Sequence, residues 1–96
     1  MSLEHRYNLE AIRNRTADLV YARVEQLLAE RADICHCEAC VLDLVTFTLN
    51  RTTPRYTTSL LGDLHPDPAL ARRQKIQIDL ALRAAVRRLK EHPHHG

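Results

Sequence analysis

Three cysteines lie within six residues of this 96-residue chain, at Cys35, Cys37 and Cys40. Thiolates are soft metal ligands, and a reversal of the chain can gather three of them around one tetrahedral zinc ion. Their odd number and tight clustering disfavour a disulfide framework. We therefore expect a structural zinc site, and the alternative is three reduced thiols that only pack.

A tetrahedral zinc ion needs a fourth ligand, and several groups could supply it. His36 is sterically awkward between two ligands; the other candidates are His65, the tail histidines His92, His94 and His95, a partner subunit, or water. A catalytic zinc would keep water there, but no acidic residue stands in a recognisable motif to act as its base. A thioredoxin-like redox role is also disfavoured, because no strand is expected before the CxxC segment. We expect no enzymatic activity.

The second group of chemically capable residues is the polar segment 50–59. Arg51 and Arg55 can each hold phosphate oxygens through two parallel hydrogen bonds, and Tyr56 offers a face for stacking a base. Further hydroxyls and guanidinium groups follow, at Thr57, Thr58 and Ser59 and, beyond the next loop, at Arg72 and Arg73 as secondary candidates. The alternative is an ordinary polar turn with Tyr56 packed in the core.

A third feature is a basic ridge on one side of the last predicted helix, formed by Arg72, Lys75, Arg83, Arg87 and Lys90. Such a ridge contacts an anion or an acidic partner, or is simply a solvated helix face. Nucleic acid is not an expected partner, because the net charge is only +2 and the sequence shows no recognisable helix-turn-helix motif or sheet with exposed aromatic residues.

Helices must position these groups, and the apolar spacing predicts where the first two lie. Residues at three- and four-residue intervals predict a helix from about Leu9 to Arg31, capped by the side chain of Asn8. The same spacing predicts a second helix over 40–49, although the β-branched stretch 45–48 would also suit a strand. The cysteines would then lie on or beside the connecting loop.

Prolines define the second half of the chain. Pro54 excludes a regular helix over 51–56, so a turn followed by extended chain is expected there. Asp67 and Pro68 predict the capped start of a third helix, which Pro93 stops. The buried stripe of that helix should be Ile78, Leu82, Ala85, Val86 and Leu89.

The length allows one small domain, residues 1–96, of the all-α class with three or four helices. A core this thin suggests that a second copy covers apolar surface on the first helix, over Ile12, Leu19, Tyr21, Val24 and Leu28. No apolar stretch approaches the ~18 residues of a membrane span, and the first residues lack a signal-peptide core. A cytoplasmic homodimer without a membrane partner is therefore expected.

Four sequence blocks together resemble the late competence ComFB family: Asn8-Leu9-Glu10, the cysteine block 34–44, the block Leu49-Asn50-Arg51-Thr52-Thr53-Pro54-Arg55-Tyr56, and the ending His92-Pro93-His94-His95. The resemblance implies a small helical protein that dimerises and, in cysteine-bearing members, holds a structural zinc. It also implies a receptor for cyclic dinucleotides, chiefly cyclic di-GMP. Cysteine-free relatives carry a Tyr-x-Thr-Ser stretch, which the segment 56–59 matches.

The expectation is thus a homodimer that binds cyclic di-GMP through Arg51, Arg55, Tyr56, Thr57, Thr58 and Ser59 and signals to a downstream protein. The sequence does not decide between cyclic di-GMP and cyclic di-AMP. It departs from the family pattern by lacking a fourth cysteine and by carrying Thr53 where leucine is usual. The alternative is a zinc-stabilised interaction dimer without a small ligand, whose basic helix recruits a macromolecular partner.

Overall fold

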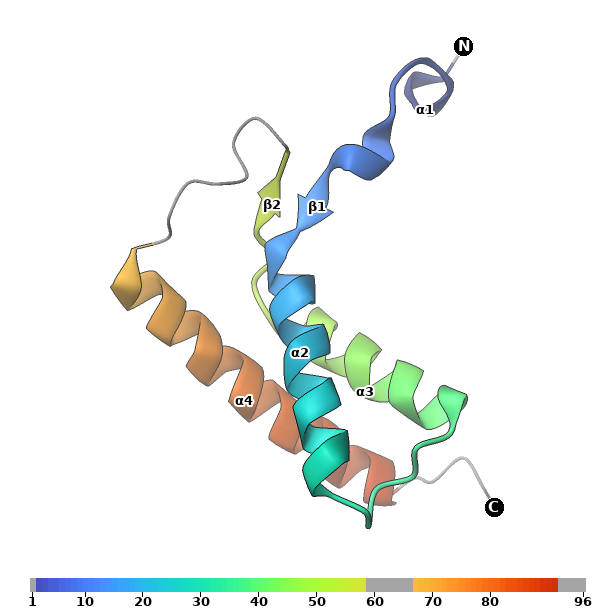
Figure 1. Ribbon diagram of the computed structural model, residues 1–96, viewed down its shortest axis with the longest axis vertical. Coiled ribbons are helices and arrows are strands. Elements are labelled where there is room, and N and C mark those ends of the chain that lie inside the picture. The colour runs from blue at the N-terminus through green and yellow to red at the C-terminus, as the bar shows by residue number, and fades with distance from the viewer. Residues whose placement is uncertain (1, 59–66, 92–96) are drawn as a thin grey trace.

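The computed structural model describes residues 2–58 and 67–91, and three long helices form its body (Figure 1). The elements in chain order are α1 Leu3–Arg6, a 3₁₀ turn Leu9–Ala11, β1 Arg13–Asn14, α2 Arg15–Glu30, α3 Glu38–Asn50, β2 Tyr56–Thr57 and α4 Pro68–Glu91. The all-α class is confirmed, with the addition of one small antiparallel sheet in which Arg13 pairs with Thr57 and Asn14 with Tyr56.

The first long helix begins later than the sequence predicts. Helix α2 starts at Arg15, not near Leu9, and its cap is Asn14, whose Oδ1 accepts a hydrogen bond from the Thr16 N–H at 3.1 Å. The predicted cap Asn8 makes no such side-chain bond. The physical reason is long-range: the backbone of β1 pairs with β2, which a continuous helix would forbid.

The other two helices follow the prediction. Helix α3 continues through residues 45–48, so the strand alternative there is wrong. Helix α4 begins at Pro68, and Asp67 Oδ1 accepts a hydrogen bond from the Ala69 N–H at 3.2 Å, as expected of a cap followed by proline. Pro93, the predicted stop, lies outside the described residues.

The core forms where α3 packs against both α2 and α4. Its buried apolar side chains include Val20, Val24, Ile34, Leu44, Ile78, Leu82, Ala85 and Val86. The predicted stripe of α4 is confirmed, with Leu89 packed at its margin. The predicted exposed face of α2 is narrower than expected, because Val24 is only 3% exposed and Leu28 packs against the core. Ile12, Leu19 and Tyr21 are exposed.

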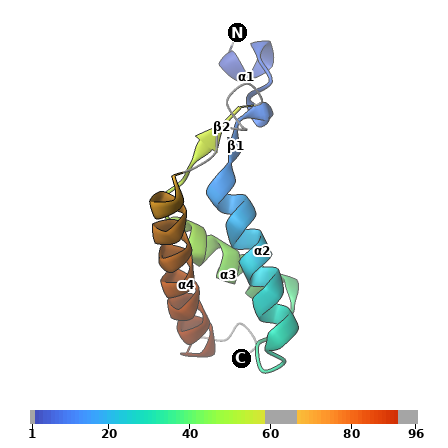
Figure 2. The same ribbon diagram turned by 60° about the vertical axis from the view of Figure 1, so that its left-hand side comes forward.

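The loop between α2 and α3 lies at one end of the three-helix body, and the β1–β2 ladder lies at the other (Figures 1 and 2). The cysteines therefore lie far from the turn around Pro54. Among the described helices, none is both long enough and apolar enough to cross a bilayer.

Candidate metal centre and the arginine-lined hollow

The cysteine loop is anchored at both ends by helix termini. Helix α2 ends where the Arg31 N–H bonds the Leu27 carbonyl at 2.9 Å, and Ile34 is buried at the middle of the loop. Helix α3 then begins with Cys37 as its cap, and Cys37 Sγ accepts a hydrogen bond from the Cys40 N–H at 3.4 Å. This capping brings the second and third cysteines to one side of the first helical turn.

The three sulfur atoms lie close enough to share one metal ion. Cys35, Cys37 and Cys40 place their Sγ atoms within 4.8 Å of one another. A tetrahedral zinc with Zn–S bonds of about 2.3 Å would need sulfurs about 3.8 Å apart, so a small inward movement of the side chains completes the geometry. The residues present therefore fit a zinc ion.

Burial controls the protonation of the third cysteine. The Cys40 side chain is buried, and this loss of solvation, with hydrogen bonds involving Cys37 and Cys35, raises the pKa of its thiol to about 12. The thiol therefore stays protonated at neutral pH unless a cation replaces the proton, as Zn²⁺ does when it binds thiolate. The positive end of the α3 dipole adds a favourable field for such thiolates.

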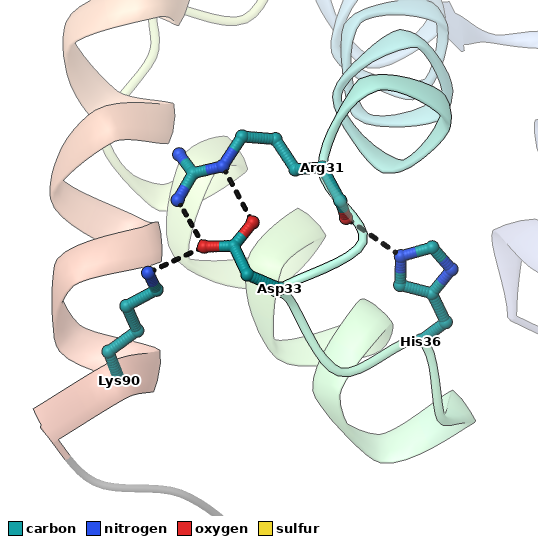
Figure 3. Close-up of polar contacts among 4 residues, drawn as sticks. All are labelled: Arg31, Asp33, His36 and Lys90. Atoms are coloured by element: carbon teal, nitrogen blue, oxygen red, sulfur yellow. Dashed lines mark hydrogen bonds and ion pairs between the residues drawn. The ribbon is translucent and has the colours of Figure 1, made fainter.

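Three ligands are supplied, and no fourth joins them within residues 2–58 and 67–91. His36 is not part of the cluster, and its Nε2 lies 3.2 Å from the Arg31 carbonyl oxygen (Figure 3). The sequence candidates His65, His92, His94 and His95 lie outside the described residues.

A charged clamp ties this loop to the end of α4 (Figure 3). Asp33 accepts hydrogen bonds from Arg31 Nε at 3.0 Å and Nη2 at 2.7 Å, and from Lys90 Nζ at 2.7 Å. The Arg31 bond first, and then the Lys90 bond, hold the pKa of Asp33 well below its usual range. Because all three side chains are 40 to 51% exposed, water and salt weaken the clamp.

At the opposite end of the molecule, the turn around Pro54 folds onto α4 and forms a hollow of about 360 Å³. Its lining residues are Thr53, Pro54, Arg55, Leu70, Arg73, Gln74 and Gln77. Two of the predicted site residues, Arg55 and Arg73, are therefore brought together, although they are 18 positions apart in the sequence.

Polar contacts, most of them partly buried, fix the shape of this turn. Asn14 Oδ1, which caps α2, also accepts a hydrogen bond from the Arg55 N–H at 2.9 Å. Thr16 Oγ1 donates to the Thr53 carbonyl at 2.7 Å and accepts a hydrogen bond from Gln74 Nε2. The Thr53 N–H in turn donates to Gln77 Oε1 at 2.9 Å. The start of α2 is thus the support on which the turn rests.

The surroundings of Arg55 and Tyr56 argue against an ordinary polar turn with Tyr56 in the core. Arg55 Nε is buried and has no hydrogen-bond partner among the described residues. Tyr56 is 67% exposed, so the alternative in which it packs in the core is wrong. Thr57 is half-buried and Thr58 exposed, whereas Ser59 lies outside the described residues.

The remaining predicted contacts lie outside the lining of this hollow. Arg51 stacks on Phe47, with 4.3 Å between its guanidinium carbon and the ring centre, and Phe47 lines a separate hollow between α3 and α4. Arg72 is exposed next to Arg73.

Sequence reasoning missed Gln74 and Gln77 as members of the hollow. A signal was present: Leu70, Arg73, Gln74 and Gln77 follow the i, i+3, i+4, i+7 pattern that places residues on one helix face. That face is mainly polar, and a search for apolar stripes therefore passes over it.

The family model for late competence development protein ComFB matches residues 13–93. The chain belongs to the ComFB family. This confirms the resemblance drawn from the cysteine and proline blocks, both of which lie inside the match. The ComFB match begins at β1, so the strand whose pairing delays α2 is its first element. No curated protein and no solved structure matches the chain.

Proposed function

We propose that this ComFB protein is a cyclic-dinucleotide receptor that acts as a homodimer and carries a structural zinc ion at Cys35, Cys37 and Cys40. The proposal is a binding module and not an enzyme, with cyclic di-GMP as the expected ligand. One observation carries it: Arg55 and Arg73 line one hollow, and Tyr56, the residue after Arg55, is 67% exposed.

The unpartnered donor of Arg55 supports an anionic ligand. A buried N–H without an acceptor costs free energy, more so in a charged group, and such an atom in a folded protein calls for an explanation. A phosphate oxygen would supply the missing acceptor, and guanidinium groups bind phosphate through paired hydrogen bonds. Tyr56 could stack on a base at the same time.

The size of the hollow supports the dimer. About 360 Å³ is at the lower end of the roughly 300–1,000 Å³ typical of small-molecule sites. A cyclic dinucleotide has two phosphates and two bases related by a two-fold axis. Two chains related by the same symmetry would present two such hollows, one for each half of the ligand.

Calorimetric titration of zinc-loaded protein with cyclic di-GMP, cyclic di-AMP and GMP tests the proposal. Replacing Arg55 or Arg73 by Ala should weaken binding by roughly 1.5 to 3 kcal/mol, or about 10- to 150-fold, the scale of a lost charge-assisted hydrogen bond. The matched control is Arg87→Ala, which removes the same charge from an exposed position on α4. If both single variants bind like the wild type, the hollow is not the site.

Arg51 is tested in the same series. The sequence predicts that it contacts the ligand, whereas its guanidinium lies on Phe47 in this chain. A loss of binding in Arg51→Ala equal to that in Arg55→Ala would extend the site to the end of α3.

The second candidate function is a zinc-stabilised dimer that recruits a macromolecular partner through α4. Four basic residues of α4 favour this function, because they are exposed and take part in no ion pair among the described residues: Arg72, Lys75, Arg83 and Arg87. The fifth residue of the ridge, Lys90, is paired with Asp33. A dimer with zinc bound that gives no heat with any of the three nucleotides would support this function over the first.

A further inference from the structure

Helices α2 and α4 meet along a surface that the described chain leaves partly open. Both helices start at the end of the body that carries the β1–β2 ladder and run in the same direction (Figure 2). Arg23 Nη2 of α2 lies 2.9 Å from Asp79 Oδ1 of α4, and we call the line along which the two helices meet the α2–α4 seam. A hollow of about 250 Å³ lies on this seam, with Leu27, Leu82 and Arg83 among its lining residues. The seam therefore has room for side chains of a second molecule.

Both helices present the same order of exposed side chains beside the seam. Counted from the ladder end, two apolar residues are followed by a charged one: Leu19, Ala22 and Glu25 on α2, and Ile76, Leu80 and Arg83 on α4. At about 100° per residue, each set covers about a third of a helical turn, on the side away from the buried Val20 and Ile78. The two outer faces are therefore alike in their apolar part and opposite in charge.

The charged residues also lie at matching heights along the helices. Arg83 lies four residues beyond Asp79, or about 6 Å along the axis. Glu25 and Glu30 lie two and seven residues beyond Arg23, so their heights bracket that of Arg83. Among the described residues, no ion pair includes Glu25, Glu30 or Arg83. These charges are therefore complementary between the two helices without being paired within the chain.

We propose that a second copy of the chain covers the α2–α4 seam, with α2 of each chain packed against α4 of its partner about a two-fold axis parallel to the helices. The proposal rests on the homodimer of the proposed function and names its contact surface. Rotation about such an axis places α2 opposite α4 and keeps every height. The apolar residues of one chain then meet those of the other, and Glu25 and Glu30 meet Arg83 of the partner subunit.

The other symmetric arrangements fit less well. An axis perpendicular to the helices would set the charged part of α2 against the apolar part of α4. It would also place the two hollows lined by Arg55 at opposite ends of a dimer whose α4 helices, of 24 residues, are about 36 Å long. Packing α4 on α4 would bring like charges together, which disfavours association. The parallel arrangement keeps both hollows at one end of the dimer, as a two-fold ligand requires.

A charge-swap experiment on the full-length, zinc-loaded chain tests this surface. Sedimentation velocity gives the dimer dissociation constant of the wild type, of Glu25→Arg/Glu30→Arg and of Arg83→Glu. Each variant alone sets like charges against each other and should dimerise at least about tenfold more weakly than the wild type. An equimolar mixture of the two should dimerise as tightly as the wild type, because both contacts then pair opposite charges. The control Arg88→Glu reverses a charge in the hollow between α3 and α4 and should leave the dimer unchanged.

Circular dichroism checks that each variant is folded, and the neutral versions Glu25→Gln/Glu30→Gln and Arg83→Gln replace any reversed variant that is not. If both reversed variants dimerise like the wild type, the seam is not the interface, although the homodimer itself stands. If only Arg83→Glu is weakened, or if the mixture does not recover, α4 meets a surface other than α2 and the pairing is wrong. A wild type that is monomeric with and without cyclic di-GMP would overturn the homodimer of the proposed function, and this interface with it.

Discussion

Two fully buried threonines allow a sharp test of how the turn around Pro54 is supported. Thr16 and Thr48 are both 0% exposed. Thr16 Oγ1 donates to the Thr53 carbonyl and accepts from Gln74, whereas Thr48 Oγ1 has no hydrogen-bond partner in the described structure. Replacing either by Val keeps the β-branched shape and removes only the hydroxyl, so the two substitutions differ mainly in what that hydroxyl bonds.

The two substitutions should change the free energy of unfolding differently. Thr16→Val loses two hydrogen bonds, each of which contributes about 0.5–1.5 kcal/mol, and water can partly compensate because Thr53 is an exposed residue; a net loss of about 1–2 kcal/mol of stability follows. Thr48→Val removes a buried hydroxyl that has no hydrogen-bond partner, so it should leave the stability of the fold unchanged or raise it by about 1 kcal/mol. Urea unfolding at fixed protein and zinc concentrations measures both. With a slope of about 1.5 kcal/mol/M, the Thr16→Val midpoint should fall by about 1 M.

Thr16→Ser is the control for the hydroxyl, because it restores the donor and should recover most of the loss. Equal midpoints for Thr16→Val and Thr48→Val would refute the reasoning. A loss in Thr16→Val that is also seen in Thr16→Ser would show that packing of the methyl group, and not the hydrogen bonds, stabilises the turn.

Three further predictions concern the metal, the clamp and the cap. Removing zinc with a chelator should lower the melting temperature, because free zinc at 1,000 times its dissociation constant contributes about 4 kcal/mol; a scan with and without chelator measures this, and no change would argue against a structural metal. Asp33→Asn should destabilise the protein at pH 7. Since the folded-state pKa of Asp33 lies below its usual 3.8, the carboxylate stabilises the fold above that value, and the difference between the two proteins should vanish as the pH falls through the lowered pKa. A difference that persists in acid, or that does not shrink in 1 M salt, would contradict the clamp. Asn14→Ala removes the acceptor of both the Thr16 and Arg55 N–H groups and should cost about 1–2 kcal/mol of stability in urea; an unchanged midpoint would mean that water replaces it.

Sequence reasoning succeeded where the cause is local. The cysteine cluster is defined by spacing alone, and the start of α4 follows from the capping chemistry of Asp67 and Pro68. It failed at the start of α2, because the strand pairing that delays the helix joins residues more than 40 positions apart. Apolar periodicity also placed Val24 on the interface side, although helix α2 has α3 and α4 to cover that position.

The candidate site was found residue by residue but not as an assembly. Arg55 and Arg73 were both named from their chemistry, yet their shared hollow depends on the β1–β2 ladder folding the turn onto α4. The contribution of Gln74 and Gln77 depends on the same contact. Apolar periodicity cannot show that a polar helix face is covered, because that depends on which other segment of the chain packs on it.

Helix α4 carries residues of two hollows with no loop between them: Gln77 lines the hollow that contains Arg55, and Leu89 lines a smaller one of about 130 Å³ that Cys35 and Cys40 also line. Each residue of a helix turns the next by about 100°, so the twelve steps from Gln77 to Leu89 set a fixed angular phase between the two hollows. Inserting or deleting one residue in that stretch would rotate one hollow away from its partner segment while leaving the other in place. The length of α4 between the two hollows is therefore constrained to the single residue.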